Sequence, residues 1–243
     1  TRRHRMNSRS LSSELRASRE HLTRITAGLD GKRLLGPKLA IVNPPLWELG
    51  HVAWFQEYWC LRRRGQDAAA ESIVRGGDAL YDSAKVAHDT RWDLPLPGLE
   101  ATLSYQAEVL ERVLRRLERE PENRELLYFV QLASFHEDMH AEAFHYTRQT
   151  LGYEDPLAGE GGEKSPSAIR HAPVLSKVEG PSAMPSGDAE LPGGAFMLGA
   201  NPDGEFVFDN EKWAHEVKLA PFRIARAPVI NAEYLEFVQA GGY

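Results

Sequence analysis

The sequence predicts an α plus α+β fold, with a helical domain at residues 8–153, a linker at residues 154–190 and the start of a mixed domain at residues 191–243. Three observations lead to this prediction. Before Gly152, apolar residues recur at the spacing of amphipathic helices. In the linker, the composition turns to Gly, Pro, Ser, Glu and Ala without periodicity. After Leu191, short alternating runs bounded by Gly, Pro, Asn and Asp indicate strands.

The first domain is expected to be a four-helix bundle. In chain order, the helices are expected at residues 10–29, 46–63, 99–119 and 122–151. Pro45 fits the first turn of the second helix, because the N–H that proline lacks has no partner there. The long irregular stretch between the second and third helices predicts one crossover connection.

The second domain is expected to begin with strands at residues 195–199, 206–208 and 216–219. A helix from Asn231 to Gln239 follows, with Asn231 as its N-cap. These residues make a small domain at best. We therefore expect a domain that is truncated at its C-terminus.

Composition excludes several classes of protein. The net charge of −6 argues against a nucleic-acid partner. There is no apolar run of about 18 residues and no signal-peptide pattern, so a membrane partner is not expected. The single cysteine, Cys60, excludes an intramolecular disulfide and is typical of a reducing compartment. We expect a cytoplasmic protein.

The run His136-Glu137-Asp138-Met139-His140 carries the strongest chemical signal. As HExxH, it is the zinc-peptidase motif, in which the glutamate is the general base. As H-x-x-x-H-x-E, it ends at Glu142 and needs no catalytic role for Glu137. Both interpretations place the two histidines on one helix face, so both predict a metal site.

The third metal ligand distinguishes the two interpretations. Downstream, His145 is rotated away from the histidine pair and His171 lies in the linker. Upstream, His51 lies in the aromatic second helix and could complete a three-histidine site inside the bundle. A hydrogen-bonded core histidine at position 51 remains the alternative. Glu142 would then orient an imidazole or lie at the surface. The histidines are expected to face the interior with a set of largely apolar side chains: Phe129, Leu132, Phe135, Met139, Ala143 and Tyr146.

The segment from Asn43 to Phe55, together with the H-x-x-x-H-x-E motif, resembles the DinB-like domain of ergothioneine-pathway sulfoxide synthases. Further motifs resemble the opening of a formylglycine-generating-enzyme-like (C-type-lectin-like) domain. They are Gly194-x-Phe196-x-Leu198-Gly199, Phe208-Asp209-Asn210-Glu211, His215-Glu216-Val217, Pro228-Val229-Ile230-Asn231 and Gly242-Tyr243. This pairing of domains is the architecture of that family.

The resemblance implies a non-haem Fe(II) enzyme with His51, His136 and His140 as ligands and O₂ as co-substrate. Its substrate would be hercynine, Nα-trimethylhistidine. The reaction would join a thiol to the imidazole ring by an oxidative C–S bond. Selenoneine synthase, which forms a C–Se bond with a selenosugar, resembles the chain equally. The catalytic tyrosine of the family is expected beyond residue 243.

The resemblance also suggests substrate-binding residues. Arg91 and His88 lie in the crossover, where the family grips the co-substrate carboxylate. Met139 stands where some sulfur-using members have glutamine. Two other functions stay open: a zinc metallopeptidase, supported by HExxH, and a DinB-like metal or thiol protein without oxygen chemistry.

Overall fold

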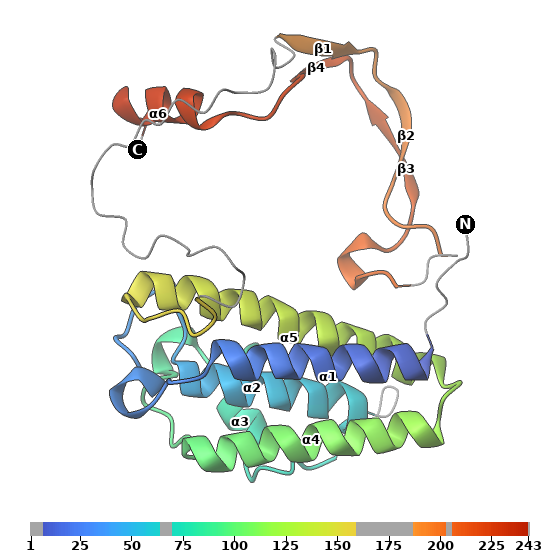
Figure 1. Cartoon of the computed structure of the whole chain (residues 1–243). Coiled ribbons are helices and arrows are strands. Elements are labelled where there is room, and N and C mark those ends of the chain that lie inside the picture. The colour runs from blue at the N-terminus through green and yellow to red at the C-terminus, as the bar shows by residue number, and fades with distance from the viewer. Residues whose placement is uncertain (1–6, 64–69, 159–186, 203–205, 243) are drawn as a thin grey trace. The chain divides into compact units, whose positions relative to one another are not determined.

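The computed structural model of the chain describes residues 7–63, 70–158, 187–202 and 206–242 (Figure 1). The chain divides into two compact units, Thr1–Ser167 and Ala168–Tyr243. The division falls inside the segment predicted as a linker, most of which lies outside the described residues. The first unit is mostly helical, and the second contains small antiparallel sheets.

The long helices of the first unit lie side by side (Figure 1). α1 packs along α5, and α2 packs against both α4 and α5. A π-helical turn continues α2, and short 3-10 turns occupy Gly31–Leu34 and His88–Thr90. The elements are α1 (Ser8–Ile25), α2 (Pro45–Glu57), the π-helical turn (Tyr58–Arg62), α3 (Gly77–Tyr81), α4 (Leu99–Arg119) and α5 (Arg124–Leu151).

Local sequence signals set the helix ends. The side chains of Asn7 and Asn123 accept hydrogen bonds from backbone N–H groups at the starts of α1 and α5. Pro45 begins α2, as predicted. Gly152 has a positive φ of 66° and ends α5, a conformation that glycine adopts without steric cost.

The first helix is shorter than predicted. It ends at Ile25 rather than Leu29. The Thr26 hydroxyl donates to the Leu22 carbonyl, and Gly28 adopts a positive φ of 74°, which turns the chain out of the helix. Leu29 is nevertheless buried, so its apolar character reflects the core and not helical periodicity.

α2 lies within the core of the helical unit. Every residue of α2 except Phe55 is buried, because its apolar side chains are distributed all round the helix. It also carries Glu48, His51, Gln56 and Glu57 into the interior, each at most 4% exposed. Buried polar groups need partners, so these side chains mark where polar interactions concentrate.

The crossover between α2 and α4 is more ordered than predicted. Glu57 accepts hydrogen bonds from the Ser72 hydroxyl and the Ile73 N–H. Arg62 forms a two-fold hydrogen-bonded ion pair with Asp78 at 2.7 and 2.8 Å. These contacts with side chains at the end of α2 hold the short helix α3 in place.

In the second unit, β1 (Asp188–Leu191) pairs antiparallel with β4 (Phe222–Ala225), and β2 (Gly194–Leu198) pairs antiparallel with β3 (His215–Leu219). α6 (Asn231–Gln239) follows. β1 therefore starts inside the predicted linker.

Two local predictions for this unit are wrong. Residues 206–208 form no strand, since they are irregular and lead into a 3-10 turn, Asp209–Glu211. The N-cap of α6 is Ile230 and not Asn231. The Glu233 side chain accepts from the Ile230 N–H and satisfies the helix start from the other direction.

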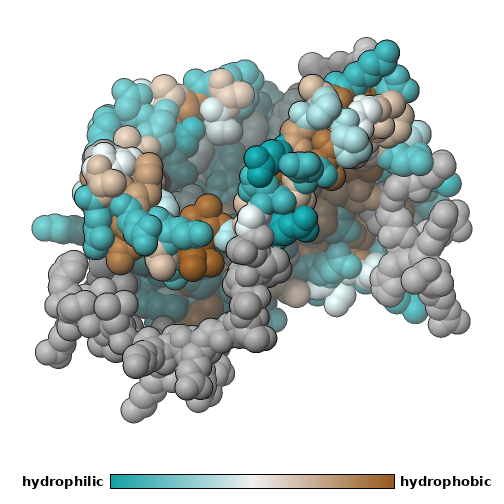
Figure 2. All heavy atoms as spheres, turned by 90° about the horizontal axis from the view of Figure 1, so that it is seen from above, coloured by the Kyte–Doolittle hydropathy of each residue, from teal (hydrophilic) through white to brown (hydrophobic). Residues whose placement is uncertain are grey.

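Much of the apolar surface in this unit is exposed, and Figure 2 shows hydrophobic residues among the hydrophilic ones at the surface. Within residues 187–202 and 206–242, Val207 is the only buried hydrophobic side chain. The exposed large side chains are Leu191, Phe196, Met197, Leu198, Trp213, Leu219, Phe222, Ile224, Val229, Ile230, Tyr234, Leu235, Phe237 and Val238. In the part of the chain described, no helix is both long and apolar enough to cross a membrane.

Candidate metal centre

Three histidines from two helices meet in the helical unit. α5 presents His136 and His140 one turn apart, and α2 presents His51. The Nε2 atom of His136 lies 3.2 Å from the Nε2 atom of His51 and 3.2 Å from that of His140. One ligand atom from each residue falls within a 4.8 Å cluster. The three ligand positions expected from the sequence therefore lie together.

The other histidines considered as third ligands are elsewhere. His145 is exposed, its ring lies 5.8 Å from the ring of His21 on α1, and it is not part of the histidine cluster. His171 lies outside the described residues.

Hydrogen bonds at the opposite ring nitrogens fix two of the imidazole tautomers. His51 Nδ1 lies 2.8 Å from the carbonyl oxygen of Tyr81, which can only accept, so Nδ1 carries the proton and donates. His140 Nδ1 donates in the same way to the Glu48 carboxylate at 2.6 Å. Both Nε2 atoms consequently present lone pairs toward His136. Among the described residues, the buried Nδ1 of His136 has no hydrogen-bond partner.

Burial favours the neutral form of His51 and His136. Burial, with the nearby His140, lowers the pKa of His51 from 6.5 to about 3. Burial and the two neighbouring imidazoles also lower the pKa of His136 well below its usual value. A neutral imidazole keeps one ring nitrogen with a free lone pair, which is the form of histidine that binds a metal.

The donor set fits a transition metal. Metal–nitrogen bonds of about 2.1 Å that meet at about 100° place neighbouring nitrogens about 3.2 Å apart, as observed for both pairs. Imidazole ligands suit zinc, copper, iron and nickel. His51, His136 and His140 would hold the metal, and the partners of their Nδ1 atoms would orient them.

Aromatic side chains hold the ligand rings in position. Phe55 stacks on His136 with ring centroids 3.7 Å apart, and Trp47 stacks on His51 at 4.8 Å. A Cβ atom at Gly50 would overlap the ring of Tyr81. Gly50 thus allows α3 to approach α2 closely enough for the Tyr81 carbonyl to reach His51.

Glu137, the would-be base of the HExxH motif, points away from the histidines. It is fully buried, and its carboxylate accepts from Nε and Nη2 of Arg19 on α1, the latter at 3.2 Å. Arg19 also donates to the Gln106 carbonyl and to the side chain of Gln56. Glu137 therefore links α5 to α1. Its carboxylate is engaged by Arg19 and is not directed at the histidine cluster, as the base of a peptidase would be.

Glu48 makes the contact with a ligand imidazole that the sequence suggested for Glu142. Glu142 is exposed on α5, whereas Glu48 is 1% exposed and hydrogen-bonded to His140. A sequence signal for Glu48 existed, since it is a charged residue in the mostly apolar first half of α2, three residues before His51. The Tyr81 contact had no such signal, because any residue supplies a backbone carbonyl.

The prediction that the whole apolar set on α5 faces inward is wrong for two members. Met139 is 52% exposed and Tyr146 is 49% exposed, although Ala143 is buried. α5 packs against α1 and α2, and these two side chains lie where neither helix covers it. Met139 thus lies at the open side of α5, next in sequence to His140.

Arg91 and His88 link the crossover to the segment that precedes α2. Arg91 donates to the Asn43 side chain at 2.7 Å and to the Val86 carbonyl at 3.2 Å, and its guanidinium lies 3.9 Å from the centre of the Trp47 ring. Burial lowers the pKa of Arg91. The Nε2 atom of His88 bonds the Val42 carbonyl at 2.8 Å.

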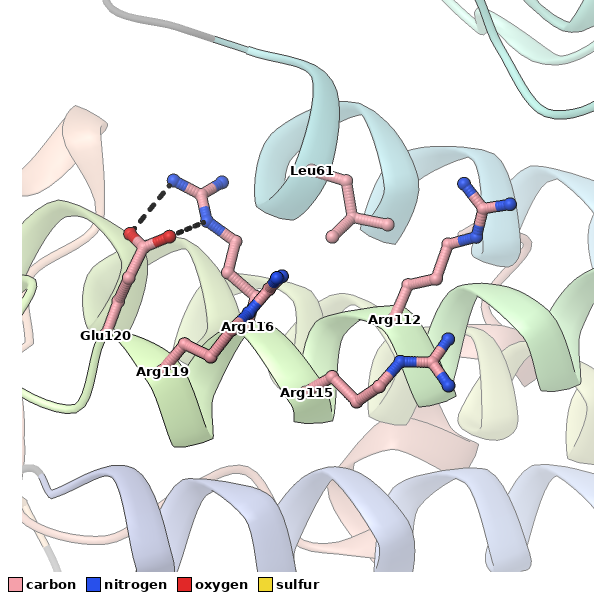
Figure 3. A pocket seen from close by; sticks show the side chains of 6 residues that line it. All are labelled: Leu61, Arg112, Arg115, Arg116, Arg119 and Glu120. Atoms are coloured by element: carbon pink, nitrogen blue, oxygen red, sulfur yellow. Dashed lines mark hydrogen bonds and ion pairs between the residues drawn. The ribbon is translucent and has the colours of Figure 1, made fainter.

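A surface cavity along α4 offers no comparable chemistry (Figure 3). Three of its four arginines pair with glutamates four residues away on the same helix: Arg112 with Glu108, Arg115 with Glu111, and Arg116 with Glu120. Such pairs are typical of a solvated helix face.

Comparison with known families matches both units. The DinB superfamily model matches residues 14–144, which include all three histidines. The model of the sulfatase-modifying factor enzyme 1-like domain matches residues 178–243.

Individual relatives agree with these matches. A protein of Mycolicibacterium smegmatis named hercynine oxygenase is 32% identical over 235 residues, covering 96% of this chain and 51% of the relative. One of Mycobacterium tuberculosis with the same name is 30% identical over 213 residues, covering 84% and 44%. A formylglycine-generating enzyme of Streptomyces coelicolor is 36% identical over 75 residues, covering 30% and 24%. The chain spans about half the length of the hercynine oxygenases it matches.

Proposed function

The chain belongs to the DinB superfamily, in the ergothioneine-type arrangement that joins a DinB part to a formylglycine-generating-enzyme-like part, and on this premise we propose that it contributes the metal centre of an Fe(II)- and O₂-dependent enzyme acting on hercynine. The relatives named hercynine oxygenase support an oxygenase and this substrate. We propose the family's architecture for the chain: a four-helix bundle at residues 8–153, a linker at residues 154–190 and the opening of the second domain at residues 191–243.

The convergence of three imidazole Nε2 atoms carries the proposal. The Nδ1 hydrogen bonds of His51 and His140 leave their Nε2 atoms free to bind a metal, and burial lowers the pKa values of His51 and His136. Three neutral ligands leave the charge of a bound Fe(II) uncompensated and leave coordination positions free for substrates. The metal would supply O₂ activation and a binding position for the imidazole of hercynine.

In this scheme, the residues of the chain orient the metal ligands and bind the co-substrate. Glu48 and the Tyr81 carbonyl accept hydrogen bonds from Nδ1 of His140 and His51, which keeps the Nε2 atoms of these ligands oriented toward the metal position. Met139, on the open side of α5, would contact the co-substrate, and Arg91 and His88 would hold its carboxylate. The product bond would be C–S with a thiol or C–Se with a selenosugar. The catalytic tyrosine is proposed to come from the part that the longer relatives have beyond this match.

Loading and product analysis test the proposal. Protein purified without oxygen is titrated with Fe(II), then given hercynine, O₂ and either a thiol or a selenosugar, and the products are identified by mass. We expect one bound iron per chain, lost in His51→Ala. Unchanged iron binding in that variant would refute the three-histidine site. If a protein that also includes the part present in the longer relatives bound iron but consumed no O₂, a non-oxidative metal or thiol protein would be favoured.

The peptidase alternative has its own test. Glu137→Gln would abolish activity if Glu137 were the base. We expect the variant to keep its metal, because Glu137 faces Arg19.

A further inference from the structure

Two tryptophans flank His51, and their electrostatic surroundings differ. The Trp47 ring lies 4.8 Å from the imidazole, but the cationic guanidinium of Arg91 lies 3.9 Å from the centre of that ring. The Trp54 ring lies 6.1 Å from the imidazole, and its N–H donates at 2.7 Å to the Asp78 carboxylate, whose charge Arg62 balances in an ion pair. A positive charge over a ring opposes the loss of an electron, whereas a hydrogen bond from the indole N–H to a carboxylate favours it. Trp54 is therefore the more easily oxidised of the two.

From Trp54, a row of rings leads outward along the end of α2. Tyr58 stacks on Trp54 at 5.3 Å, and Trp59 lies 5.2 Å from Tyr58. Exposure increases along the row, because Trp54 is buried whereas Tyr58 and Trp59 are half-buried. The spacing of His51, Trp54 and Tyr58 places them on one helix face. His136 is linked to the same region through Phe55, whose ring lies 6.0 Å from Trp59.

We propose that Trp54 and Tyr58 form an electron-transfer path that removes oxidising equivalents from the three-histidine centre when no organic substrate consumes them. The inference rests on the proposed O₂-dependent function. Indole and phenol are the most easily oxidised aromatic side chains. Electron tunnelling falls steeply with distance, so rings in contact outcompete longer routes. The path protects the ligand histidines from oxidation.

Each step conserves electrons and protons. Trp54 gives one electron to the oxidised metal centre and keeps its N–H proton, hydrogen-bonded to Asp78. Tyr58 returns the electron to Trp54 and releases its phenol proton to water. A thiol in solution then donates a hydrogen atom to Tyr58, and two such thiols end as a disulfide.

Peptide mapping of oxidative damage tests the path. Fe(II)-loaded protein is exposed to O₂ without hercynine, and oxygen addition is assigned to single residues and quantified by tandem mass spectrometry. In the wild type, we expect oxidation at Tyr58 and Trp59, with intact ligand histidines. In Trp54→Phe, oxidation at His51 and His136 themselves should rise several-fold.

Two further variants sharpen the test. Trp47→Phe is the matched control, because it removes the indole closer to His51. We expect its pattern of oxidised residues to equal that of the wild type. Tyr58→Phe, which removes only a hydroxyl, should move the damage to Trp54. Circular dichroism and anaerobic iron binding check each fold.

The outcomes separate the path from the proposed function. If the Trp54→Phe and Trp47→Phe variants both bind iron and show the same pattern of oxidised residues, the electron-transfer path is refuted and the proposed function is not. A wild type that binds no iron overturns the proposed function and the path with it.

Discussion

Replacing Glu48 with glutamine tests whether a buried carboxylate sets the affinity of the metal centre. The change keeps the shape of the side chain and one oxygen within reach of His140 Nδ1, now 2.6 Å from the carboxylate. It converts a charge-assisted hydrogen bond into a neutral one. Hydrogen bonds to charged groups are worth about 1.5–3 kcal/mol and neutral ones about 0.5–1.5 kcal/mol. The difference of about 1–1.5 kcal/mol corresponds to about tenfold weaker metal binding.

That value lies at the lower end of the losses of about 10–100-fold in metal affinity that follow mutation of groups orienting metal-ligating histidines. The assay is competition between the protein and a chelator for Fe(II) under anaerobic conditions, at a pH above neutral so that proton competition is small. Glu142→Gln is the matched control: the same substitution, two residues beyond His140, at an exposed position with no expected effect. Equal affinities in the two variants would refute the orienting role of Glu48.

Three other predictions concern the scaffold. Gly50→Ala should destabilise the fold by about 1–3 kcal/mol, because the new methyl group would overlap the tyrosine ring packed there. Gly98→Ala, where a Cβ meets nothing within 4 Å, is its control, and thermal melting compares them. Arg19→Met should cost about 3–5 kcal/mol in urea unfolding, since it leaves Glu137 buried and unpaired; an intact Tm would contradict this. Burial raises the pKa of Cys60 from 9.0 to about 12, so the thiol should react with alkylating agents only after unfolding. The unfolded thiol loses its proton first, so Cys60's contribution to stability should decline as the pH rises from 9 toward 12. Rapid labelling of the folded protein would disprove its burial.

The ligand histidines could be predicted from the sequence because their signal is local. His136 and His140 are one helical turn apart, and His51 lies in a helix too apolar to be anything but buried. The predicted ends of α4 and α5 also lie within two residues of the observed ones, because Pro121 and Gly152 delimit them. Periodicity and breaker residues carry such information.

The partners of the ligands could not be predicted, because they act across helices. Glu48 reaches His140 from another helix, and Arg19 reaches Glu137 over a sequence separation of 118 residues. Met139 was assigned to the interior because apolar residues usually mark a core. Whether a helix face is covered depends on its neighbours, and the described helices of the first unit leave Met139 exposed.

The origin of the ligands on two helices has a consequence for folding. His51 and His136 are 85 residues apart, so a metal bound to both closes a large loop and acts as a non-covalent cross-link between α2 and α5. Binding free energy then becomes folding free energy: metal at about 100 times its dissociation constant adds about 2.7 kcal/mol to the stability of the native state. Chelation would loosen the helix pair that holds the site, and the same ion would govern both the chemistry and the lifetime of the fold.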